Sequence, residues 1–562
     1  MDAEPSLSRG GEPFLAVGSS LAETSRVRWM NWAVWLFVVL GIAARLVRYL
    51  VAYPIWHDEA FLAVNLWDRD PIDLLRPLDY HQVAPWFFLT IEWVAVRCLG
   101  YSELSLRLFP TICGVLGVLL FARLSGKLLV GPSRLLAVAI FATSFYPIRH
   151  SAEIKPYASD LLASLVLLTL AAEAWKRPGS SRPWWLLAAV APALLALSYP
   201  AVFTAAGVWV ALVPRVLRNG GRLARIGCVT YALVVVASFL AVYFACTQHQ
   251  SQEVGSTYRW GYWAASFPPL DRPWLVPFWL IEKLTGPMMA YPVGDRNGGS
   301  AATFLCVLAG GWILYRQGQS ALLGLLAMPL VMGLVAAFLG RYPFGGAARI
   351  ALYLAPSLCL LAGLGAAGLM ARIPRERARL RVLWILVLGF LGLGCGIIAR
   401  DLVRPYRTAE DVRTRDFARW FWTEDPRGVG AVCTRTDLGL SFRPELWRSG
   451  MSAVYLFHHY QYAARRRQGR PLEIDPASYS PDRPLRAVVF DGLPATEPLF
   501  RRWLQAMQQR FVLRRIETFV IHPGKPAEPW LRDAYAVLEF TPRPGLAGLA
   551  VRLDERGHRR FH

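Results

Sequence analysis

Long hydrophobic blocks alternate with short polar segments along most of this chain. Each block is close to the ~20 apolar residues that a helix needs to cross a bilayer core. The pattern therefore predicts an all-α membrane protein that crosses the bilayer many times. The clearest blocks are residues 31–51, 226–245, 301–315, 321–339, 350–370 and 382–398.

Short basic segments separate these blocks and indicate their orientation. Arg26 and Arg28 precede the first block, and basic loops tend to stay in the cytoplasm, so we expect that block to run outward. Placing the basic turns at 215–225 and 372–381 in the cytoplasm as well predicts about eleven spans. The further expected spans are residues 105–122, 135–148, 156–175, 184–198 and 201–217.

Two apolar segments do not fit a complete span. A span at residues 83–99 would reverse the expected side of the basic turns, and the segment is short and contains Glu92 and Arg97. We expect it to be an amphipathic interfacial helix in the first outer loop. Residues 273–291 are apolar but are broken by Pro277 and Pro287, so we expect a re-entrant or interfacial segment.

The two ends of the chain differ from its centre. Residues 1–28 are polar and are predicted to be a disordered cytoplasmic N-terminus, ahead of a transmembrane domain at 29–400. Residues 401–562 contain no spanning block. They show β-like runs at 487–490, 512–521 and 535–540 and an amphipathic helical pattern at 497–510. We expect a small soluble α/β domain outside the cytoplasm.

The composition and charge indicate which kind of partner this chain contacts. The 562 residues are 55% hydrophobic and carry a formal net charge of +22. The basic residues gather between hydrophobic blocks and in the tail, which favours a lipid bilayer over nucleic acid as the partner. The eight cysteines include no CxxC pair, and most lie in or beside apolar blocks, where cysteine acts as a small hydrophobe.

An acidic pair, Asp58 and Glu59, lies in the first predicted outer loop beside His57. A carboxylate at a membrane surface can serve as a general base for an attacking hydroxyl or amine. An isolated pair of this kind is more often a solvated acidic loop, so the interpretation depends on its neighbours.

The neighbours are cations, which the orientation places on the same outer side. Arg and Lys can neutralise the phosphate of a lipid-linked substrate and stabilise charge on a departing phosphate. Each could instead snorkel to lipid headgroups, and Glu103 with Arg107 could be a structural i,i+4 pair. The candidate phosphate ligands are Arg107, Arg149, Lys155, Arg341 and Arg349.

The order of these motifs resembles the GT-C superfamily of glycosyltransferases that use polyprenyl-phosphate sugars. It is most similar to glycosyltransferase family 39, which contains protein O-mannosyltransferases and the aminoarabinose transferase of lipid A. The resemblance covers residues 32–400. Its motifs are Asp58-Glu59-Ala60, an aromatic stretch with Pro85, and the segments 103–110, 149–157 and 341–356.

The resemblance implies a GT-C fold and transfer of a hexosyl or pentosyl group from a polyprenyl-phosphate donor to an extracytoplasmic protein, lipid or polysaccharide. It implies that Asp58 is the catalytic base, that Glu59 supports the acceptor or orients Asp58, and that the outer cations hold the donor phosphate. Direct displacement would invert the anomeric configuration. His57, His81 and Glu103 are candidate contacts to the acceptor or phosphate.

This chain departs from the aminoarabinose transferases at one motif. Where they have Lys-Pro-Pro, it has the sequence from His81 to Pro85, which leaves the lipid A acceptor open. A divalent metal held through Asp58 and Glu59 also stays open, because no ligand set has convincing spacing.

Two other classes of function remain as alternatives. A transporter would place charged groups within its spans and show internal repeats, whereas a non-catalytic cell-envelope assembly protein would need neither the acidic pair nor the cations. For the transferase, we expect the bacterial inner membrane, with the active site outside the cytoplasm.

Overall fold

The computed structural model describes residues 21–79, 82–252, 261, 263–294, 298–406, 409–420, 485–490, 497–522 and 533–543. The chain divides into two compact units. The first contains Met1–Val51 and Asp70–Val403, and the second contains Ala52–Arg69 and Arg404–His562. The segment with Asp58 and Glu59 thus belongs to the second unit, whereas the sequence placed it within a domain at 29–400.

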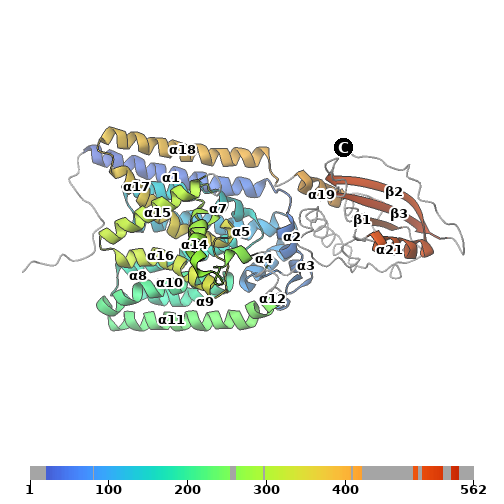
Figure 1. Ribbon diagram of the computed structural model, residues 1–562, viewed down its shortest axis with the longest axis horizontal. Helices are drawn as coiled ribbons and strands as arrows, with labels where there is room; N and C mark the ends of the chain where they lie inside the picture. The colour runs from blue at the N-terminus through green and yellow to red at the C-terminus, as the bar shows by residue number, and fades with distance from the viewer. Residues whose placement is uncertain are drawn as a thin grey trace, which may run out of the picture. The chain divides into compact units, whose positions relative to one another are not determined.

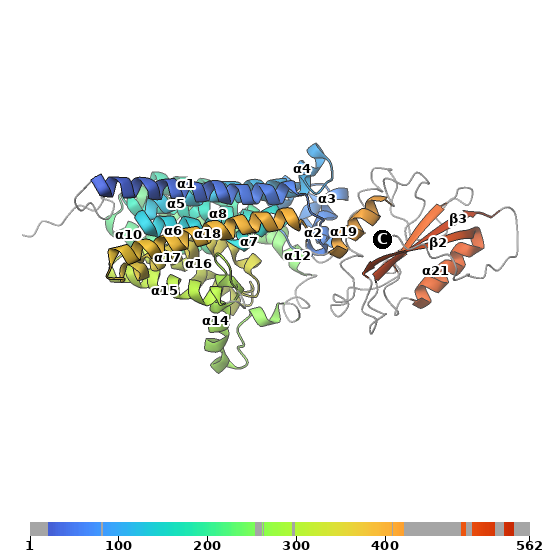
Figure 2. The same cartoon turned by 90° about the horizontal axis from the view of Figure 1, so that it is seen from above.

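The first unit is a bundle of helices, in which α1 and α18 run side by side (Figures 1 and 2). Within the described residues, eight helices are long and apolar enough to cross a membrane. Two shorter apolar helices, α6 and α9, and the 18-residue α15 bring the number of helices in expected spans to eleven. The prediction of an all-α membrane bundle is therefore confirmed. The eleven helices are α1 (Leu21–Leu50), α5 (Ser105–Leu128), α6 (Gly131–Ala142), α8 (Tyr157–Lys176), α9 (Arg182–Leu197), α10 (Ala201–Asn219), α11 (Arg222–Val242), α15 (Gly299–Arg316), α16 (Ser320–Phe338), α17 (Ala355–Ala371) and α18 (Glu376–Val403).

Two of the helix limits that differ from the prediction have a local cause. Helix α1 begins at Leu21, inside the segment expected to be disordered, where Leu, Ala and Glu favour a helix; residues 1–20 lie outside the described part. The expected span at 135–148 ends at Ala142, and a separate helix, α7 (Phe145–Arg149), follows. The hydroxyls of Thr143 and Ser144 donate to carbonyls of the preceding turn, an arrangement that competes with helix continuation.

The two segments that were not expected to span form short helices. Helix α4 (Trp86–Leu99) has 14 residues, starts after Pro85 and ends at Gly100, whose φ is +82°. Glu92 of α4 is buried, and burial raises the pKa of this carboxyl well above its ordinary value. Residues 273–291 contain η7 (Pro273–Leu275), α14 (Val276–Thr285) and η8 (Pro287–Met289), none of which is long enough to cross a bilayer.

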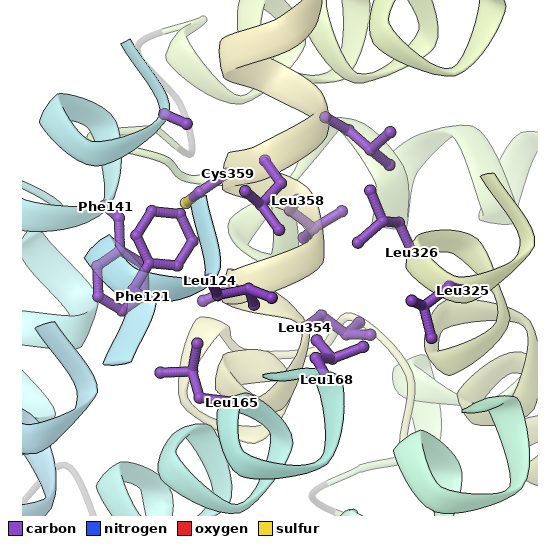
Figure 3. Packing of buried hydrophobic residues seen from close by; sticks show 14 of the residues in the cluster. Phe121, Leu124, Phe141, Leu165, Leu168, Leu325, Leu326, Leu354, Leu358 and Cys359 are labelled. Carbon is purple, nitrogen blue, oxygen red and sulfur yellow. The ribbon is translucent and has the colours of Figure 1, made fainter. Parts of the chain in front are cut away.

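Helix α17 lies at the centre of the apolar core. Figure 3 shows Leu358 and Cys359 of α17 between two aromatic rings on one side and leucines of α16 on the other. The rings belong to Phe121 and Phe141, which stack with their centroids 4.1 Å apart. Glycines let α15 approach α17 closely, since a Cβ at Gly310 would meet the α17 backbone. Such close approach drives helix association where lipid offers no hydrophobic gain.

Ion pairs tie the helices together at each end of the bundle. At one end, Arg48 of α1 pairs with Asp401 of α18 at 2.9 Å. We call this the loop end; it also holds the start of α5, the α7–α8 turn (residues 149–156) and the end of α16. At the opposite end, Lys127 of α5 pairs with Glu173 of α8. The basic turns that were predicted to share one side of the membrane all lie at that opposite end.

The second unit contains a three-stranded antiparallel sheet in the order β1-β3-β2. Its strands are β1 (Leu485–Phe490), β2 (Phe511–His522) and β3 (Asp533–Pro542), with helix α21 (Glu497–Arg510) between the first two. The expected α/β fold near the C-terminus is confirmed. Helix α19 (Ala409–Arg419) precedes the sheet, and Arg415 of α19 donates to the Ala52 carbonyl at 3.4 Å, joining the first-loop segment to this unit.

Candidate active site

The acidic pair lies in the first turn of α2 (His57–Ala63) in the second unit. Trp56 is extended and the helix begins directly after it, so both carboxylates lie at the end of the helix where negative charge is favoured. Glu59 is buried, and its Oε2 accepts the Trp56 N–H at 3.4 Å. Asp58 is half-buried. Glu59 therefore helps to close the first turn of the helix, and Asp58 is the more accessible carboxylate.

The cations gather in the first unit around the α7–α8 turn. Glu153 in this turn accepts hydrogen bonds from Arg149 Nε at 3.2 Å and from His150 Nδ1 at 2.6 Å. Its side chain is only 2% exposed. From α1, Arg48 donates through Nε to the Arg149 carbonyl at 3.1 Å. Helix α1 thus contacts the turn although Arg48 and Arg149 are 101 residues apart in the sequence.

The electrostatics of this turn determine its protonation states. Burial by itself raises the pKa of Glu153, but contacts with His150, Arg149 and Arg48 lower that pKa well below its ordinary value. An ionised carboxylate can only accept hydrogen bonds, so His150 Nδ1 must carry the shared proton.

Lys155 connects this turn to the first loop. Its Nζ donates to Gln82 Oε1 at 2.7 Å, and both side chains are buried. Gln82 belongs to the segment where the chain departs from the Lys-Pro-Pro motif. The sequence therefore identified Lys155 but not its partner.

The same loop segment has a second anchor that sequence reasoning missed. The Ala84 N–H donates to Gln250 Oε1 at 3.1 Å, and the Tyr199 hydroxyl lies 3.0 Å from the Ala84 carbonyl. Gln250 also donates to the Leu74 carbonyl at 3.3 Å. These residues are far apart along the chain and match no motif, so no local signal could have indicated the contacts.

The other three predicted phosphate ligands occupy different positions at the loop end. The Arg349 guanidinium lies 5.9 Å from the centre of the Trp263 ring and acts electrostatically on His150. Arg107 is buried near the start of α5, whose Thr111 hydroxyl lies 3.1 Å from the Ser151 carbonyl in the α7–α8 turn. Arg341 is exposed just after α16. The structure thus brings Arg149, Lys155 and Arg349 to the turn, with Arg107 on the adjacent helix.

The remaining candidates fall into two groups. Glu103 is buried just before α5. The predictions for the His57 side chain and for His81 lie outside the described residues. In the described part of the chain, no group of three or more His, Cys, Asp or Glu side chains is arranged to hold a metal ion.

Comparison with known proteins identifies the fold of this chain. No protein-family model matches the chain, and no curated protein matches it. Among solved structures, it is similar to ArnT from Cupriavidus metallidurans bound to undecaprenyl phosphate, with a TM-score of 0.50 and 12% identity over 90% of this chain and 98% of ArnT. The chain has the GT-C fold. This fold and the long apolar helices show that the chain is an integral, multi-pass membrane protein.

Two further solved structures match the chain with lower TM-scores. AglB, the oligosaccharyltransferase of Archaeoglobus fulgidus in complex with an inhibitory peptide and a dolichol-phosphate, is 13% identical, with a TM-score of 0.43 over 72% of this chain and 59% of AglB. The apo form of an oligosaccharyltransferase from the same organism is 10% identical, with a TM-score of 0.48 over 87% of this chain and 73% of that one.

Proposed function

We propose that this chain is a membrane glycosyltransferase that moves a sugar from a polyprenyl-phosphate donor to an extracytoplasmic acceptor. The observation that carries the proposal is the buried cationic turn at one end of a GT-C bundle. ArnT, which shares the fold, was crystallised with undecaprenyl phosphate. The donor class follows from that likeness together with the cations of the turn.

The cations suit a lipid-linked phosphate. Arg48, Arg149, Lys155 and Arg349 gather at the α7–α8 turn, where Asp401 pairs with Arg48 and Glu153 pairs with Arg149. Buried charge near a membrane is costly and commonly functional. Arginine binds phosphate oxygens in pairs, and fixed cations stabilise the charge that develops on a departing phosphate. In the proposal Arg149, Lys155 and Arg349 bind the donor phosphate.

Arg107 and Arg341 have supporting roles in the proposal. Arg107 is buried on the helix beside the turn and adds to its positive potential. Arg341 is exposed and is suited to attract the anionic lipid before it binds.

Asp58 is the proposed base. It accepts the proton of the acceptor group as that group attacks the anomeric carbon, and the sugar is transferred with inversion. Glu59, which closes the first turn of α2, positions Asp58. His57, His81 and Glu103 are proposed contacts to the acceptor or phosphate.

The orientation is also part of the proposal. The basic turns at the end opposite the loop end favour a cytoplasmic location there, and in the proposal the α7–α8 turn faces the other side of the membrane. Residues 1–28 would then be cytoplasmic, residues 29–400 the transferase domain, and residues 401–562 an extracytoplasmic domain. A bacterial inner membrane is the proposed location.

The test is a transfer assay on the purified full-length chain in lipid nanodiscs. A panel of radiolabelled polyprenyl-phosphate hexoses and pentoses is incubated with protein, lipid and polysaccharide acceptors. We expect label to move to one acceptor class with release of polyprenyl phosphate. R149M should lower kcat/KM by about 100-fold, as expected for removing one charge-stabilising donor.

The matched control is R182M, which removes an exposed cation at the opposite end of the bundle and should leave transfer unchanged. Folded protein that transfers no sugar from any donor would refute the proposal. Flux of the labelled sugar phosphate across vesicles would then indicate a transporter, and its absence an assembly protein.

A further inference from the structure

His150 has chemical features that the cation cluster alone does not require. Its ring is 5% exposed and lies between two tyrosines, stacked on Tyr146 at 6.0 Å and edge-on to Tyr157 at 5.2 Å. Its Nδ1 donates to ionised Glu153 at 2.6 Å. No described residue hydrogen-bonds Nε2. Glu153 therefore fixes the tautomer and leaves Nε2 as the reactive nitrogen.

The charges around His150 favour an anion beside it. Arg149 at the end of α7 and Arg349 in η9 (Ala348–Leu354) both act on the ring, and Arg48 of α1 lies behind Arg149. Helix α5, which also packs on this turn, contributes buried Arg107, and the turn itself contributes Glu153. Burial and the two arginines lower the pKa of His150, and Glu153 opposes them. Burial and the arginines thus disfavour a proton on this imidazole, and an anion that enters beside it favours that proton.

We propose that His150 binds the donor phosphate through Nε2 as an imidazolium and donates that proton to the departing polyprenyl phosphate. Glu153 is the positioning residue that holds the ring. This inference rests on the proposed function. It assigns a general acid, whereas the transfer itself requires only cations and a base.

The step balances in atoms and charge. The bond between the anomeric carbon and the phosphate oxygen breaks, and its electron pair stays on that oxygen. The phosphate would then change from a diester with one negative charge to a monoester with two. The Nε2 proton passes to this oxygen, so the monoester leaves with one charge and His150 returns to its neutral form. A phosphate monoester with a second pKa near ~6 is well matched to an imidazole.

The binding part is tested with farnesyl methyl phosphate, a phosphodiester that carries one charge across the whole pH range used. Calorimetry at pH 5.5 to 8.5, in buffers of different ionisation enthalpy, measures affinity and proton uptake together. We expect wild type to take up about one proton per ligand near neutral pH and to bind at least ~10-fold more weakly at the alkaline end.

Two substitutions test the roles of the two ring nitrogens of His150 separately. H150N keeps an N–H near the Nδ1 position for Glu153, and H150Q places a non-titrating N–H near the Nε2 position. Both should lose proton uptake and the pH dependence, and H150Q should keep more of the affinity. H249Q, on α12 (Gln248–Gln252), is the matched control and should behave as wild type. Thermal unfolding of each variant shows whether it is folded, and a folded H150N suffices for the test.

The acid part is tested with the donor identified in the transfer assay. H150Q should reduce kcat by about 100-fold, the usual contribution of a general acid. A donor with fluorine on the polyprenyl chain, close to its phosphate ester, releases a less basic phosphate. The loss of kcat in H150Q should therefore be smaller with this donor. A purely structural role would leave the deficit unchanged.

The outcomes separate this inference from the proposed function. Sugar transfer with the same proton uptake in wild type and H150N refutes the role of His150 and leaves the transferase intact. Wild type that neither binds farnesyl methyl phosphate nor transfers sugar refutes both.

Discussion

The ion pair between Arg48 and Asp401 joins α1 and α18 at the loop end of the bundle, and its contribution to stability can be tested directly. Their side chains are 15% and 6% exposed, and the charged atoms are 2.9 Å apart. D401L removes the carboxylate and leaves the Arg48 charge buried. Breaking a buried pair from one side costs about 3–5 kcal/mol, far more than the loss of a surface pair.

The double variant R48M/D401L makes this prediction sharper. Replacing both members with apolar residues is close to neutral for the pair itself, since no buried charge is left behind. The double variant does lose the donation from Arg48 to the Arg149 carbonyl, which is worth about 1.5–3 kcal/mol. We therefore expect it to be more stable than D401L alone.

Equilibrium unfolding in mixed micelles, followed by tryptophan fluorescence during titration with SDS, measures these free energies. E376Q, at the other end of α18, is the control and should cost less than about 1 kcal/mol. A loss below about 1 kcal/mol in D401L, or a double variant less stable than D401L, would show that the pair does not hold the two helices together.

Three further predictions follow from the packing and the charges. G310A should destabilise the bundle by about 1–3 kcal/mol, because its Cβ would meet the facing α17 backbone. G389A has open space around its Cβ and should be neutral or slightly stabilising. Thermal unfolding of the two variants in parallel tests this difference. Glu153 has a lowered pKa, so its contribution to stability is complete above its unfolded pKa of about 4.3 and is lost below it as the carboxylate protonates. The thermal stabilities of wild type and E153Q should therefore converge as the pH falls below about 4, and a constant difference would contradict this. Q82L should leave Lys155 without its amide acceptor and weaken farnesyl methyl phosphate binding by about 10-fold in calorimetry, and unchanged affinity would separate Lys155 from the phosphate site.

The spans could be predicted because each is a long apolar run whose ends are marked by charge. The sequence also predicted that α4 does not cross the membrane, since Glu92 and Arg97 interrupt its apolar surface. The strands of the second unit could be predicted for a similar reason, because β2 and β3 alternate or run in β-branched and aromatic residues. The end of α6 was missed because hydroxyls at Thr143 and Ser144 break the helix without breaking the apolar run.

The site was only partly predictable, because its contacts join distant segments. Arg149 and Lys155 were found as cations near a predicted surface, but Gln82 reaches Lys155 from 73 residues away. The pairing of His150 with Glu153 did have a local signal, a histidine and a carboxylate three residues apart at a helix junction. The grouping of residues 52–69 with the C-terminal unit had none, because it depends on a contact such as that of Arg415, 363 residues from Ala52.

The central claim is that Asp58 activates the acceptor of a polyprenyl-phosphate glycosyltransferase. The most direct measurement is the rate at which the purified protein releases polyprenyl phosphate from saturating donor and acceptor, in wild type and in D58N. The control is D73N, which changes an exposed carboxylate in the same loop. We predict that D58N lowers the rate by about 10²–10⁴-fold while D73N leaves it unchanged. Turnover by D58N at the wild-type rate would contradict the account.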